Sequence, residues 1–152
     1  PSRRWLITGA SRGLGHALAM LAHARGDRVC LVARGPGVEN AAAVIGARAM
    51  GVAADVSEPG AIAHVAAVMQ ERWGGVDVLV FTAGVGENND DVRQGACEGL
   101  AFMGIEIDPA KNSVARAESD ISVDGSRVRV LVVPTNEELA IATETARICS
   151  KS

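Results

Sequence analysis

The residue types best suited to chemistry lie near the start of the chain, in residues 4–15, which read RWLITGASRGLG. A short apolar run leads into a glycine-rich turn, and a helical pattern follows. Gly9 lets the chain turn sharply, Gly13 lets the backbone approach a pyrophosphate, and Gly15 leaves room for a helix to pack on a strand. The exposed amides and positive dipole end of that helix attract anions. This pattern predicts a phosphate-binding loop, although glycine loops also simply turn corners.

The spacing TGxxxGxG directly after a first strand resembles the cofactor loop of the short-chain dehydrogenase/reductase family. The resemblance covers about residues 1–80 and implies that a dinucleotide binds at the loop. The loop residues that it assigns to cofactor binding are Gly9, Ser11, Arg12, Gly13, Leu14 and Gly15.

Two arginines bear on the choice of cofactor. Arg34 follows the apolar run of residues 29–33, and ligands of parallel sheets bind beyond the carboxyl ends of the strands. An acidic residue at that position would accept the hydroxyls of an unphosphorylated ribose, whereas Arg34 together with Arg12 favours a 2′-phosphate. We therefore expect NADP rather than NAD, and the alternative is that both arginines are hydrated surface charges.

The reductase resemblance also implies a role for Asp55 and Val56, which match the Asp-Val pair that lies against the adenine in that family. The catalytic part of the family is not matched. The sequence contains no tyrosine, so the proton donor of reductase chemistry is absent. The Asn-Asn-Ala-Gly motif of the family is replaced by residues 81–84, FTAG.

The second half, about residues 76–152, resembles the C-terminal end of acetate kinase. The segments that carry the resemblance are DVLVFTAGVGEN, DVRQGACEGLAFMGIEID and SRVRVLVVPTNEELAIATETARI. The resemblance implies that the turn at Gly84 contacts ATP and that Glu137 helps to hold magnesium. The kinase's N-terminal domain, which carries its phosphate loop and acetate pocket, has no counterpart in this sequence, so kinase activity is not expected.

Both resemblances meet in the strand VDVLV, which either family could supply. We expect one α/β domain over residues 1–152, a Rossmann-like three-layer doubly wound parallel sheet with five main strands in the order 3-2-1-4-5 and a short extra hairpin strand. Strands are predicted at residues 29–33, 47–54, 76–81 and 128–133 besides the first, with a hairpin arm at 121–123. Helices are predicted at residues 16–25, 40–46, 57–73 (Ser57 as N-cap), 90–103 (stopped by Gly104) and 137–149.

The pairing of two incompatible halves suggests that the chain is a chimera, built or selected in the laboratory, with a natural gene fusion as the alternative.

The net charge of -3 gives no broad positively charged surface for binding nucleic acid. No apolar run approaches the roughly 18 residues of a membrane span, so we expect a cytoplasmic protein. Cys30, Cys97 and Cys149 lack metal-ligand spacing and are interpreted as buried thiols. Self-association stays open, because helices through which such reductases associate are partly absent.

Three functional interpretations follow from the sequence. The first is a catalytically silent domain that retains NADP(H) binding, or binding of another adenine nucleotide, at its glycine loop. The second is a folded scaffold that binds no ligand. The third is an enzyme, either an NADPH-dependent oxidoreductase with an unusual proton donor or an ATP-dependent kinase.

Overall fold

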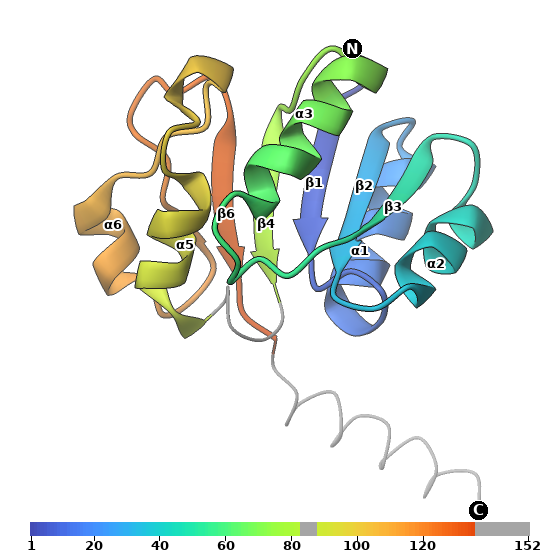
Figure 1. Ribbon diagram of the computed structural model, residues 1–152, viewed down its shortest axis with the longest axis horizontal. Coiled ribbons are helices and arrows are strands. Elements are labelled where there is room, and N and C mark those ends of the chain that lie inside the picture. The colour runs from blue at the N-terminus through green and yellow to red at the C-terminus, as the bar shows by residue number, and fades with distance from the viewer. Residues whose placement is uncertain (83–87, 136–152) are drawn as a thin grey trace, which may run out of the picture.

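Figure 1 shows the computed structural model of the chain, and the structure describes residues 1–82 and 88–135. Several sequence predictions fall outside these residues. They are the turn at Gly84, the proposed magnesium ligand Glu137, the final helix at 137–149 and the thiol of Cys149.

One sheet holds the strands of both halves of the chain. Its order is β3-β2-β1-β4-β6-β5, and all neighbours are parallel except β5 and β6, which are antiparallel. The predicted order of the five main strands is thereby confirmed, with β6 as the fifth and β5 as the short hairpin strand. The strands are β1 (Arg4–Thr8), β2 (Arg28–Ala33), β3 (Ala49–Ala53), β4 (Val78–Thr82), β5 (Ser119–Asp120) and β6 (Arg129–Val133).

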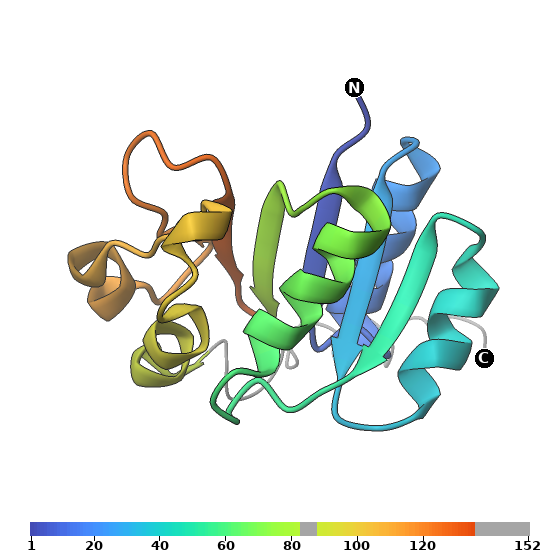
Figure 2. The same cartoon turned by 45° about the horizontal axis from the view of Figure 1, so that its top comes forward.

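Helices cover both faces of this sheet (Figures 1 and 2). One apolar core lies between the sheet and α1 and α2, and the other lies between the sheet and α3 and α5. The predicted three-layer arrangement is therefore present in the described residues. The helices are α1 (Gly13–Ala24), α2 (Gly37–Ile45), α3 (Ala61–Trp73), α5 (Asp90–Cys97) and α6 (Pro109–Val114), with a short 3-10 helix η1 (Ala101–Met103).

Strand β4 shows why the chain adopts this arrangement. All five of its residues, VLVFT, are buried, because side chains alternate between two faces that are both covered. Leu79 and Phe81 belong to the core beneath α3, whereas Val78 and Val80 belong to the core beneath α1. This strand pairs with β1 on one side and β6 on the other, so it joins the reductase-like and kinase-like parts.

The predicted start of the third helix at Ser57 is wrong. Helix α3 begins at Ala61, and its N-cap is Gly60, whose φ is 79°. Ser57 instead donates from its hydroxyl and its backbone N–H to Asp55 Oδ1, at 2.6 and 2.9 Å. Glu58 precedes Pro59 in the sequence, and a residue before proline is disfavoured in helical conformation, which explains the later start.

The helix predicted to run from Asp90 to the stop at Gly104 is divided into two. Helix α5 ends at Cys97 because Glu98 already leaves the helical conformation with a ψ of 134°, and Gly99 follows with a φ of 75° before η1. Gly104 does end η1, with a φ of 81°. The hairpin arm also lies slightly earlier than predicted: β5 covers Ser119–Asp120, and only the N–H of Ile121 continues the pairing, donating to the Val130 oxygen at 2.9 Å.

Candidate functional site

The predicted cofactor residues of the first half gather at the carboxyl ends of the parallel strands, toward which the arrows of β1 and β4 point in Figure 1. The glycine loop follows β1, Arg34 follows β2, and Asp55 with Val56 follows β3. Because β3, β2 and β1 are adjacent and parallel, these three loops meet at one edge. Gly84 lies outside the described residues, so the structure places the other nine predicted residues at this edge without it.

The glycine loop turns at two glycines with positive φ. Gly9 and Gly13 both have a φ of 62°, a backbone conformation that residues other than glycine rarely adopt. A Cβ built on Gly13 would meet no atom within 4 Å, so the space beside its backbone is open. The N–H of Ala10 donates to the Val32 oxygen at 3.2 Å, which ties the loop to the end of β2.

Gly15 has a different role from Gly13. A Cβ at this position would lie 2.7 Å from the Gly9 oxygen and 3.0 Å from the Ala10 Cα. The start of α1 therefore packs directly on the backbone of the loop that follows β1, whereas the sequence analysis expected a contact between helix and strand. Close packing at Gly15 holds the first turn of the helix against the loop.

The N-terminus of α1 carries no internal anion. Arg12 is the N-cap in extended conformation, it makes no side-chain cap hydrogen bond, and the first turn contains no acidic residue. Ser11 and Arg12 are exposed, and Leu14 is 40% exposed. No acidic side chain in the first turn of α1 therefore offsets the positive end of the helix dipole.

Arg34 and Asp55 stand on neighbouring loops. The hydrogen bonds from Ser57 lower the pKa of the Asp55 carboxyl, and the nearby positive charge of Arg34 lowers it further. Desolvation raises this pKa, but the lowering effects prevail and the pKa lies below its usual range. Asp55 is therefore ionised at neutral pH. Its Oδ1 accepts both hydrogen bonds from Ser57. Beside it, Val56 packs against the core beneath α3.

Sequence reasoning missed a link between Thr8 and Thr82 at the same edge. The Thr8 hydroxyl donates to the Thr82 carbonyl at 3.3 Å and accepts from the Thr82 N–H at 3.2 Å. Both residues are buried, at the last positions of β1 and β4. A threonine ending each of two apolar runs was the available signal. The link fixes the spacing of these strands where the sheet meets the loops.

The described residues contain no group of three or more histidine, cysteine, aspartate or glutamate side chains that could hold a metal ion. Within the same residues no helix has the length and apolar character to cross a membrane. The exposed groups at this edge include the backbone of the glycine loop and the guanidinium groups of Arg12 and Arg34, which are groups of the kind that can bind phosphate.

Comparison with protein families shows which family the chain belongs to. The model described as "Acetokinase family" matches residues 46–143, which is more than half of the chain. The chain belongs to the acetokinase family. The match begins upstream of the predicted meeting point near residue 76, so the acetokinase likeness overlaps the part that the sequence analysis assigned to the reductase-like half.

Curated relatives agree with the acetokinase assignment. The chain is 56% identical over 78 residues to an acetate kinase of Bacteroides fragilis, which covers 51% of this chain and 20% of that protein. It is 40% identical over 108 residues to an acetate kinase of Limosilactobacillus fermentum, covering 71% of this chain and 27% of that protein. The acetokinase-family chain thus spans about a fifth to a quarter of these relatives.

Solved structures show the second likeness. The chain matches the 3-ketoacyl-(acyl-carrier-protein) reductase of Brucella melitensis, solved in complex with NADH, with a TM-score of 0.52 and 36% identity. This match covers 55% of the chain and 34% of the reductase. An acetokinase-family chain with a reductase-like Rossmann fold has the chimeric composition that the sequence predicted, and that prediction is confirmed.

Proposed function

We propose that this chain binds NADP(H) at its glycine loop and does not catalyse hydride transfer. The observation that carries the proposal is the backbone of Gly13, which has a positive φ and open space at the start of α1. A diphosphate at this position would accept hydrogen bonds from the first amides of the helix, and its charge would complement the positive end of the dipole.

The phosphorylated cofactor is favoured over NAD by the charges on the adjoining loops. Arg12 and Arg34 are both exposed, one inside the glycine loop and one at the end of β2. Guanidinium groups bind phosphate in bidentate geometry, which gives the 2′-phosphate both charge and direction. Asp55 would accept a hydrogen bond from the adenine amine through its unengaged oxygen, as the reductase likeness implies.

The absence of catalysis rests on composition. Hydride transfer to a carbonyl needs a group that supplies a proton, and this sequence has no tyrosine to do so. When bound, NADPH would supply a hydride, but the chain's own residues would only hold the cofactor. Binding without turnover is therefore the expected outcome.

Calorimetric titration of the purified chain with NADPH, NADH and ATP, each alone, tests the proposal. We expect micromolar binding of NADPH and weaker binding of the other two nucleotides. Gly13→Asp should abolish NADPH binding, because it places a side chain and a negative charge in the cradle. Gly95→Asp is the matched control, since Gly95 is an exposed helical glycine with equally open space.

Circular dichroism must show that the Gly13→Asp variant is folded. NADPH binding that survives this substitution would place the site elsewhere, and no binding of any nucleotide to the unmodified chain would support the scaffold interpretation. NADPH oxidation with a panel of carbonyl substrates, or phosphoryl transfer from ATP to acetate, would overturn the proposed lack of catalysis.

A further inference from the structure

A hollow of about 760 Å³ lies at the amino ends of the parallel strands. Its lining includes the first residues of four strands: Arg4 of β1, Arg28 of β2, Val78 of β4 and Arg129 of β6. The glycine loop is at the opposite, carboxyl edge. The hollow therefore belongs to a part of the molecule that the proposed NADP(H) site does not use.

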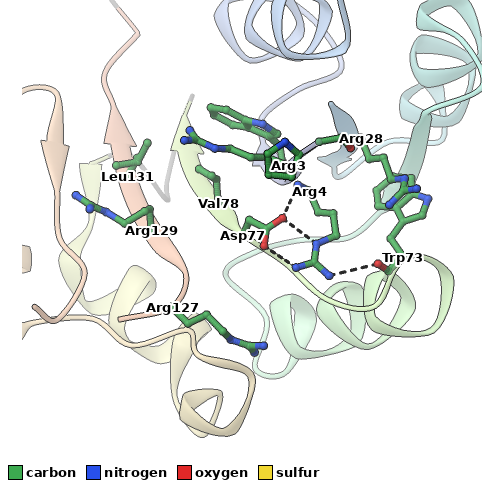
Figure 3. A pocket seen from close by; sticks show the side chains of 12 residues that line it. Arg3, Arg4, Arg28, Trp73, Asp77, Val78, Arg127, Arg129 and Leu131 are labelled. Atoms are coloured by element: carbon green, nitrogen blue, oxygen red, sulfur yellow. Dashed lines mark hydrogen bonds and ion pairs between the residues drawn. The ribbon is translucent and has the colours of Figure 1, made fainter. Parts of the chain in front are cut away.

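Positive charge dominates the rim of this hollow. Its lining contains one carboxylate, that of Asp77, which already accepts two hydrogen bonds from the guanidinium of Arg4. The side chains of Arg3 and Arg28 make no hydrogen bond or ion pair within the described residues. The arginines around the hollow are Arg3, Arg4, Arg28, Arg127 and Arg129 (Figure 3).

Arg129 is partly engaged but accessible. It pairs with Asp120 of the neighbouring strand β5, and its side chain is 63% exposed. Arg127 donates to the Met103 carbonyl. The rim thus offers the unpaired charges of Arg3 and Arg28 and the exposed guanidinium of Arg129.

The floor of the hollow is apolar. Trp5, Val78 and Arg129 lie opposite one another across β1, β4 and β6, so their side chains share one face of the sheet. Leu131 is the next residue of β6 on that face and is half-buried, and Figure 3 shows it on the Arg129 side of Val78. Within the described residues, the helices of this face, α1 and α2, pack on the β1 side of the sheet.

We propose that this hollow binds an organic anion that joins a phosphate, sulfonate or carboxylate to an apolar body. The anionic group would lie between Arg3, Arg28 and Arg129, and the apolar body would cover Trp5, Val78 and Leu131. The volume falls within the range of about 300–1,000 Å³ that small-molecule sites occupy. The site goes beyond the proposed NADP(H) function and does not depend on it.

The test uses 2-naphthyl phosphate as the probe in calorimetric titrations of the full chain. Inorganic phosphate carries the charge alone and 2-naphthol carries the apolar body alone, so each is expected to bind at least about tenfold more weakly than the probe. Raising the salt concentration should weaken probe binding, because the arginines are exposed to solvent. The Trp73→Phe variant leaves Trp5 as the single tryptophan, and its fluorescence should change on binding.

Substitutions locate the probe. Arg3→Gln combined with Arg129→Gln should weaken binding at least about tenfold, since each removes a charge-assisted hydrogen bond. Leu131→Asp, which puts a negative charge on the floor, should weaken it as well. Arg116→Gln is the matched control, an exposed arginine after α6 that does not line the hollow, and it should leave the affinity unchanged.

Three results would overturn the proposal. These are probe affinity no better than that of inorganic phosphate, affinity unchanged in the double arginine variant, and loss of binding in Gly13→Asp. The last result would show that the probe occupies the glycine loop instead. NADPH binding is measured separately on the arginine variants, so failure at the hollow is distinguishable from failure of the proposed function.

Discussion

The guanidinium of Arg4 donates from Nε and Nη2 to the two carboxylate oxygens of Asp77, at 2.8 and 2.5 Å. The backbone reinforces this pair, since the Arg4 N–H donates to Asp77 Oδ2 at 2.8 Å and the Asp77 N–H donates to the Arg4 carbonyl at 2.9 Å. The Asp77 carbonyl then accepts from the Arg129 N–H at 3.0 Å. Asp77 therefore connects the start of the reductase-like strand β1 with the start of β6.

Asp77→Asn should lower the free energy of unfolding by about 1–2 kcal/mol at pH 7, because it removes the negative partner of a half-buried bidentate pair. Hydrogen bonds from Arg4 lower the pKa of the Asp77 carboxyl against an opposing desolvation effect. A carboxyl with a depressed folded-state pKa stabilises the fold above its unfolded pKa of about 3.9, and this contribution is lost as the pH falls through the folded-state pKa.

The difference between the parent chain and Asp77→Asn should accordingly shrink as the pH falls below about 4, which urea unfolding curves across that range measure. Asp124→Asn is the control. Asp124 pairs with Lys111 but its side chain is 96% exposed, so its replacement should change the stability little at any pH. A difference for Asp77→Asn that is constant with pH would exclude the ionised pair as its cause.

Gly15→Ala should destabilise the chain by about 1–3 kcal/mol, because the new Cβ would lie against backbone atoms that cannot easily move. The paired substitution Gly95→Ala should do the opposite. Gly95 lies in α5 with open space around it, and alanine in a helix is favoured over glycine by about 0.5–1 kcal/mol. Thermal unfolding of both variants decides the matter, and equal effects at the two sites would contradict the close packing at Gly15.

Arg34→Asp should reverse the order of cofactor affinity. The substitution removes a phosphate ligand and adds a carboxylate that accepts ribose hydroxyls, so NADPH should bind at least about tenfold more weakly and NADH more tightly. Titration calorimetry with both cofactors measures the ratio, and Arg116→Asp controls for the change in net charge. An unchanged ratio would show that Arg34 does not contact the ribose.

Cys30 and Cys97 should resist alkylation in the folded chain. Both thiols are buried, and burial raises the pKa of each to about 12. The reactive thiolate is therefore scarce at pH 8 and also inaccessible. Mass spectrometry of peptides after iodoacetamide treatment should find these two residues unmodified until denaturant is added. Rapid labelling of either thiol in the native chain would mean that its layer opens locally.

The strand order could be predicted because the buried strands are almost wholly apolar and the crossovers between parallel strands are right-handed. Local boundaries were harder to predict. Ser57 has the right residue type for a helix cap, but its hydroxyl donates to Asp55 and the helix starts at Ala61. The helix breaks at Glu98 and Gly99, but the apolar periodicity continues to Met103, so the periodicity alone could not reveal the interruption.

The sequence likewise predicted some parts of the candidate site and missed others. Gly13 and Gly15 were assigned separate roles from their spacing, and their surroundings differ, since the space is open at Gly13 and crowded by loop backbone at Gly15. The Thr8–Thr82 link and the arginine hollow depend on which strands are neighbours, and residues distant in sequence become adjacent only in the sheet. The threonines that end two apolar runs were a weak signal for the link, whereas no local pattern indicated the arginine hollow.

The two-residue strand β5 also bears on how the sheet could associate with other chains. It occupies the hydrogen-bonding side of β6 around Leu131 and Val132, and the ion pair between Asp120 and Arg129 fastens it there. Without β5, the unpaired N–H and C=O groups of β6 could pair with a strand of another chain. The short, charged strand β5 occupies part of these groups. The two residues of β5 therefore leave less of the edge of β6 available for pairing with another chain.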